Sequence, residues 1–102
     1  MTEEVNILEK DTPKSIKLAD GKEYEFPVMS LNVLANVQKT MGFKINEIPT
    51  KLIADPIENA RLVYYALLKE KYADITLEKT GDLITFQNIK VLDKFLMDLL
   101  VG

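Results

Sequence analysis

The stretch IKLADGKEYEFP, residues 16–27, decides the fold because its register determines which apolar side chains need cover. It alternates apolar and polar residues around a turn, as a β-hairpin does. A two-residue loop would divide its large apolar side chains between the two faces of the hairpin. A three-residue loop, with Gly21 left-handed as a bulge, pairs Ile16 with Tyr24 and puts all of them on one face. We predict this second register, in which one face carries Ile16, Leu18, Tyr24 and Phe26.

That apolar face needs cover because a lone hairpin is only marginally stable in water. Pro13 and Pro27 bracket the two strands, where a missing N–H costs no ladder hydrogen bond. The rest of the chain has helical patterns, so we predict an α+β fold: an N-terminal β-hairpin packed on a mainly helical bundle of three to five helices. We expect residues 14–102 to form this single domain and residues 1–13 to form a flexible acidic arm or a weak extra strand.

The 102-residue chain contains no cysteine and no histidine. It therefore lacks thiolate nucleophiles, disulfides, zinc ligands of these types and the commonest general base near neutral pH. Its motifs place no nucleophile beside a base, and Asp93 and Asp98 are spaced so that a helix does not align them. The sequence predicts a protein that is not an enzyme and that uses no cofactor or metal.

The charge balance indicates which partners are disfavoured. The chain has 13 basic and 16 acidic residues, and Arg61 is its only arginine. A net charge of −3 disfavours binding to a phosphate backbone, which needs a basic surface. No run approaches the ~18 apolar residues of a membrane span, and the acidic start lacks the pattern of a signal peptide. We therefore expect a cytoplasmic protein with no nucleic-acid partner and no membrane partner.

Two helices are predicted by their end signals. Ser30 is a suitable N-cap and Gly42 a suitable C-terminal glycine for a helix between them, which we expect to cover the hairpin. The segment that follows contains Pro49, which predicts a loop with at most one helical turn at residues 51–54. A second helix begins at Asp55-Pro56 and runs to about Tyr72. Because it is apolar on two sides, it should be the central helix.

The C-terminal third predicts two more helices. Thr76 caps a short one, which Gly81 is expected to bend or split. The last helix runs from about Asn88 to Val101, and its apolar residues cover roughly half of its circumference, against ~100° for a typical surface helix. This excess predicts an apolar surface that binds a partner. The residues proposed for it are Leu62, Tyr65, Phe95, Met97, Leu100 and Val101.

The sequence leaves three alternative interpretations open. The proposed surface residues could close the core of the domain itself or form a homo-oligomer contact. The chain could be a small bacterial interaction or adaptor domain whose hairpin edge pairs with a partner strand. The succession of a short helix, a turn and a second helix in residues 75–96 also has the outline of a DNA-binding helix-turn-helix. Against that, its second helix is mainly apolar, whereas recognition helices present polar side chains to base edges.

The order of the motifs is similar to that of a known family. A hairpin with DGKEYEF, an amphipathic helix, a central helix with ARLVYYALL and then DITLEKTGDLI follow one another over residues 15–86. This succession resembles the small tail assembly chaperones of long-tailed bacteriophages and prophages. The resemblance implies a non-enzymatic protein of the bacterial host cytoplasm that binds the tape-measure protein, keeps it soluble and helps to recruit the tail-tube protein. Many members of that family are also made as a longer product by ribosomal frameshifting.

Overall fold

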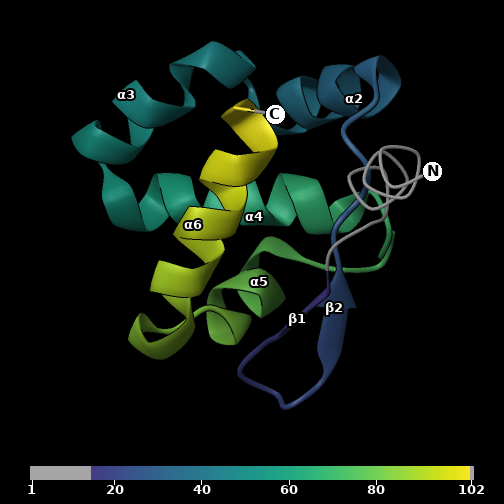
Figure 1. The fold of residues 1–102 in the computed structure, drawn as a ribbon, viewed down its shortest axis with the longest axis vertical. Coiled ribbons are helices and arrows are strands. Elements are labelled where there is room, and N and C mark those ends of the chain that lie inside the picture. The colour runs from purple at the N-terminus through teal and green to yellow at the C-terminus, as the bar shows by residue number, and fades with distance from the viewer. Residues whose placement is uncertain (1–14, 102) are drawn as a thin grey trace, which may run out of the picture.

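The computed structural model describes residues 15–101, with the backbone alone for residues 99–101. These residues form a two-stranded antiparallel hairpin followed by five α-helices and one turn of 3₁₀ helix (Figure 1). The elements are β1 (Ser15–Lys17), β2 (Glu23–Glu25), α2 (Leu31–Met41), η1 (Ile45–Glu47), α3 (Ile48–Ala54), α4 (Pro56–Lys69), α5 (Leu77–Leu83) and α6 (Phe86–Val101). The predicted α+β class, a hairpin with a helical bundle, is confirmed. The proposed arm at residues 1–13 lies outside the described residues.

The hairpin adopts the register with the three-residue loop. Ile16 lies opposite Tyr24, and the N–H of Leu18 donates to the carbonyl of Lys22 at 3.0 Å. Gly21 has a φ of +81°, in the left-handed region that the bulge requires. The apolar residues therefore share one face, as predicted, and two of them, Leu18 and Phe26, are buried.

Cover for the hairpin comes from the C-terminal half of the chain. The ring of Phe26 lies 4.8 Å from that of Phe95 on α6, measured between centroids. The loop N–H of Ala19 donates to the carbonyl of Leu83, the last residue of α5, at 3.1 Å. The hairpin is thus packed against α5 and α6. The expectation that the helix after Ser30 covers it is wrong, because α2 packs on α4.

The turn after α4 adds a second contact to the hairpin. The tyrosine Tyr72 accepts a hydrogen bond from the N–H of Glu25 at 2.9 Å, and its ring meets that of Tyr24 edge-on at 5.3 Å. The predicted helix end near Tyr72 is too late by three residues, since α4 ends at Lys69. The chain turns there, so Tyr72 reaches the hairpin instead of continuing the helix.

α4 is the central helix, as predicted. It contacts α2, α3 and α5, and α6 crosses it in Figure 1. Its N-terminus is capped by Asp55, whose carboxylate accepts from the N–H of Glu58 at 3.2 Å. Both of its apolar sides are used, and its buried residues are Val63, Tyr64, Ala66, Leu67 and Leu68.

α2 has the predicted ends. The hydroxyl of Ser30 accepts from the N–H of Val33 at 3.2 Å, and Gly42 is left-handed with a φ of +86°. Val37 is buried, but Leu31, the first residue of the helix, is 84% exposed. The start of α2 therefore stands in solvent, whereas Val37 and Met41 further along the helix are buried.

The segment with Pro49 is helical, so the predicted loop is wrong. Pro49 stands in the first turn of α3, where its missing N–H would have no partner within the helix in any case. The residue before it, Ile48, has helical angles of φ −53° and ψ −50°. Its side chain is buried, and this burial offsets the preference of a pre-proline residue for extended backbone.

α5 is continuous through Gly81, which was expected to bend or split it. The glycine has a packing role, because a Cβ built there would lie 3.0 Å from Cδ of Arg61 on α4. α6 begins two residues earlier than predicted, at Phe86. None of the helices in residues 15–101 combines the length and the apolarity that crossing a bilayer requires.

The burial of Phe26 predicts a large effect of its removal. We expect Phe26→Ala to lower the free energy of unfolding by about 3–5 kcal/mol, because the cavity would open between the hairpin and α6. Phe86→Ala is the matched control, since Phe86 is 93% exposed, and it should change stability by less than about 0.5 kcal/mol. Urea denaturation followed by circular dichroism measures both. Equal effects of the two substitutions would contradict the proposed packing.

The hairpin loop predicts a loss of stability at high pH. The hydroxyl of Tyr24 donates to Asp20 at 2.7 Å, and this hydrogen bond, with some loss of hydration, raises the pKa of Tyr24 to about 12. The ordinary value is near 10, so the contribution to stability is complete below about pH 10 and is lost as the pH rises towards about 12.

Comparison with Tyr24→Phe isolates this effect. The stability difference between the natural chain and the variant should shrink over the same pH range, as urea denaturation at successive pH values would show. Absorbance of tyrosinate should also show one late-titrating group fewer in the variant. A difference that is constant with pH would rule out the bond.

Candidate protein-binding groove

The residues proposed for partner binding do not form one exposed surface. Phe95 is only 8% exposed and packs on Phe26, so its assignment to an exposed surface is wrong. α6 turns this side towards the hairpin and α4, because the buried face of the hairpin needs a large apolar partner there. Leu92 and Leu96, on the same side of α6, are buried with it.

The remaining proposed residues are more accessible. Met97 is 54% exposed, whereas Leu62 and Tyr65 on α4 are half-buried. The ammonium group of Lys69 lies 5.5 Å from the centroid of the Tyr65 ring and so partly covers it. Leu100 and Val101 lie outside the residues whose side chains the structure describes. Among the proposed residues with described side chains, Met97 is the exposed one.

Exposed apolar side chains gather elsewhere, around a groove between two helix corners. One corner joins α3 to α4 and the other joins α5 to α6, and both lie at the left of Figure 1. The groove has a volume of about 790 Å³. Its larger apolar lining residues are Leu52, Ile53, Ile57, Ile84, Phe86 and Ile89. We call this set of residues, with the charged residues described below, the corner groove.

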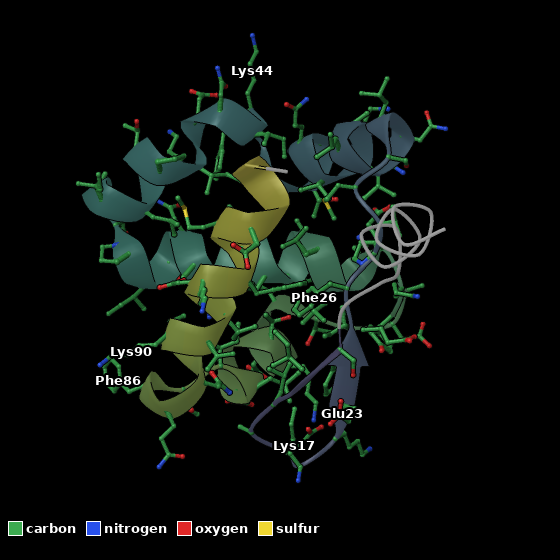
Figure 2. All side chains as sticks on the ribbon, viewed as in Figure 1. Lys17, Glu23, Phe26, Lys44, Phe86 and Lys90 are labelled. Atoms are coloured by element: carbon green, nitrogen blue, oxygen red, sulfur yellow. The ribbon has the colours of Figure 1, made fainter. Side chains whose placement is uncertain are left out.

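Three of these side chains are almost fully in solvent. Ile53 is 84% exposed, Ile57 78% and Phe86 93%. In Figure 2, Phe86 points outward from the start of α6, beside Lys90. Single exposed apolar residues are ordinary on protein surfaces, but several around one hollow are typical of a binding site.

The α3–α4 corner is held by two polar side chains. At the end of α3, the N–H of Asp55 donates to the carbonyl of Lys51 at 3.0 Å. The carboxylate of Asp55 caps the start of α4. The side-chain amide of Asn59 donates to the same carbonyl of Lys51 at 2.6 Å. The corner therefore has a defined angle, and it carries Ile53 on one arm and Ile57 on the other.

The α5–α6 corner has an equivalent arrangement. The side chain of Asn88 accepts from the N–H of Thr85 at 2.8 Å, in the manner of a capping box. The amide of the same side chain donates to the carbonyl of Leu83, at the end of α5, at 2.8 Å. Asn88 thus ties the start of α6 to the end of α5, and Phe86 projects from between them.

The rim of the corner groove is acidic. Its charged lining residues are Glu58, Arg61, Glu78, Asp82 and Asp93. Arg61 forms a salt bridge with Glu58, one turn earlier on α4. The lining therefore combines four carboxylates and one guanidinium with apolar side chains, so the groove is suited to apolar groups that are accompanied by cations.

A hydrogen bond between α4 and α6 involves Asp93, one of the residues that line the groove. The hydroxyl of Tyr64, whose side chain is fully buried, donates to Oδ1 of Asp93 at 2.8 Å. Burial, together with this bond, raises the pKa of Tyr64 far above its ordinary value, so the phenol stays neutral. The bond connects the central helix to the helix that forms one wall of the groove.

The sequence patterns missed this site for identifiable reasons. The sequence predicts a loop with at most one turn around Ile53, a central helix that is apolar on two sides around Ile57, and a last helix that begins after Phe86. Only tertiary packing brings the two corners together. A usable signal was nonetheless present, since apolar residues flank the Asp55-Pro56 corner on both sides.

Comparison of the chain with protein-family models, with curated proteins and with solved structures found no match in any of the three. Support for a function therefore comes from the corner groove and from the order of the sequence motifs.

The Tyr64–Asp93 bond predicts a measurable coupling. In a double-mutant cycle of Tyr64→Phe and Asp93→Ala, we expect a coupling free energy of about 1 kcal/mol in urea denaturation. The matched control combines Asp93→Ala with Tyr65→Phe, because Tyr65 is the neighbouring half-buried tyrosine. That cycle should give no coupling. A coupling equally large in both cycles would show that the effect does not come from this bond.

Proposed function

We propose that this chain is a tail assembly chaperone of a long-tailed bacteriophage or prophage, without enzymatic activity. In this role it binds the tape-measure protein, keeps it soluble and aids assembly of the tail tube in the bacterial host cytoplasm. The observation that carries the proposal is the corner groove, where Ile53, Ile57 and Phe86 stand almost fully exposed around one hollow.

The groove suits the requirement of such a chaperone. A tape-measure protein is a long amphipathic helix, and its apolar side must be covered until it is assembled. Covering it requires an apolar surface on the chaperone, which costs solubility unless a partner uses it. Docking of a helix into a groove, through apolar anchors on successive turns, is the usual way to use such a surface.

The order of the motifs is the second support. DGKEYEF forms the loop and second strand of the hairpin, ARLVYYALL lies within α4, and DITLEKTGDLI leads into α5 and forms it. The resemblance to the tail assembly chaperones thus extends over the hairpin and the helices that carry the α4 and α5 sides of the groove. Its succession of motifs, rather than any one of them, connects the chain to that family.

The composition supports a binding role over a catalytic one. The chain has no histidine and no cysteine, and the groove offers carboxylates and a single guanidinium beside apolar side chains. These groups bind cations and apolar surfaces, but they do not pair a nucleophile with a base. The same carboxylates on α5 and α6 would repel a phosphate backbone, which disfavours the helix-turn-helix alternative.

If the proposal holds, a tape-measure protein is encoded next to this chain, and coexpression of the two tests the proposal. We expect the tape-measure protein to become soluble and to copurify with the chain. Ile57→Asp should reduce both, because it places a charge in the apolar wall of the groove. The matched control is Leu31→Asp, since Leu31 is as exposed as Ile53 but lies on α2, away from the groove.

Two results would contradict the proposal. One is a tape-measure protein that remains insoluble with the natural chain. The other is full solubility with Ile57→Asp, which would place any binding outside the corner groove. Circular dichroism of each variant establishes that it is folded before it is compared.

A further inference from the structure

We propose that the corner groove selects a basic amphipathic helix: a helix with apolar residues on one face and with lysine or arginine on the flanks of that face. This inference rests on the proposed function only for the identity of the protein that supplies the helix. The selection itself is argued from the walls and the charges of the groove.

The lining favours a helix over an extended segment. It comes from α3, α4, α5, α6 and the corners between them, and the hairpin contributes no residue to it. An extended peptide there would meet no strand edge, so its N–H and C=O groups would lie over apolar side chains without partners. A helix satisfies its own backbone groups and presents only its side chains to Ile57 and Phe86.

The acidic rim sets the sign of the partner's charge. Two of the four carboxylates already have partners, since Glu58 pairs with Arg61 and Asp93 accepts from Tyr64. Glu78 and Asp82, both on α5, have no salt bridge within residues 15–98. Cations on the flanks of a bound helix would lie against this pair.

The placement of Glu78 and Asp82 adds to the argument. They are four residues apart on α5, so they face the same side of the helix and repel each other. The nearby guanidinium of Arg61, whose side chain lies against Gly81, is paired with Glu58. A lysine or arginine from the partner would reduce this repulsion on binding. The groove is thus more favourable for a basic helix than for an acidic helix with the same apolar face.

Charge also favours a basic helix over two other possible occupants of the groove, which are residues 1–13 of the same chain and a second copy of the chain. Residues 1–13 carry Glu3, Glu4, Glu9 and Asp11 against the single side-chain cation of Lys10, so they have the same sign as the rim. A second copy of the chain has a net charge of −3. Complementarity therefore favours a separate, basic partner.

Binding of two designed helical peptides to the full-length chain tests the inference. They share an apolar face with leucine on successive turns, and their flanking residues are lysine in one and glutamate in the other. Fluorescence anisotropy should give an affinity about tenfold higher for the lysine peptide. That preference should weaken between about 50 mM and about 300 mM salt, as screening increases.

Two double variants, each of which replaces two carboxylates by amides, distinguish the effect of the groove's charge from the effect of the chain's net charge. The double variant Glu78→Gln, Asp82→Asn should remove most of the preference for the lysine peptide. The matched control, Asp74→Asn with Asp98→Asn, removes two exposed carboxylates that do not line the groove and changes the net charge equally. It should leave the preference intact, while Ile57→Asp should weaken both peptides.

Several outcomes would overturn the inference. Equal affinity for the two peptides, or an equal loss in the control variant, would show that the groove does not select charge. Dimers in sedimentation that Ile57→Asp dissociates would identify a second copy as the occupant. Tighter peptide binding by the full-length variant Ile7→Asp, Leu8→Asp would identify the N-terminal residues instead.

The peptide experiment is independent of the chaperone assignment. Selective binding of the lysine peptide, with no effect on the tape-measure protein, would remove the proposed function and leave the groove's preference standing. A soluble tape-measure complex that is insensitive to the Glu78 and Asp82 variants would remove the inferred charge preference and leave the proposed function standing.

Discussion

The packing of Phe26 against Phe95 is the contact on which the rest of the structure depends. A hairpin with three-residue strands cannot stay folded by itself, and Phe26 gives it a fully buried anchor in the helical body. The same contact sets the rotation of α6, since the side that carries Phe95 must face inward. Once that rotation is set, Asp93 meets Tyr64 and Phe86 is carried out to the solvent at the other end of the helix.

Features encoded by a few neighbouring residues could be predicted from the sequence. The hairpin register follows from alternation around Gly21, and both ends of α2 and the start of α4 follow from Ser30, Gly42 and Asp55, because each signal acts within one turn. The α3 helix could not be predicted in this way. Burial of Ile48 outweighs the preference of a residue before proline for extended backbone.

The solvent-exposed side of the last helix could not be predicted either. Phe95 and Met97 were both proposed for one exposed surface, but the structure buries Phe95 against the hairpin and leaves Met97 exposed. No local sequence pattern indicates the groove, because its two walls are about thirty residues apart along the chain. Its existence depends on how α4 and α6 cross, which is a property of the whole core.

The asparagine side chains at the two corners have a consequence for the thermodynamics of association. Asn59 and Asn88 fasten each corner through hydrogen bonds to backbone carbonyls, so both walls are already in place before anything enters. A preorganised site pays little conformational entropy on binding, and the remaining cost falls on the incoming segment, which must become helical. Affinity would then be graded by the intrinsic helix propensity of that segment, and this small protein could serve as a rigid template on which a flexible chain folds.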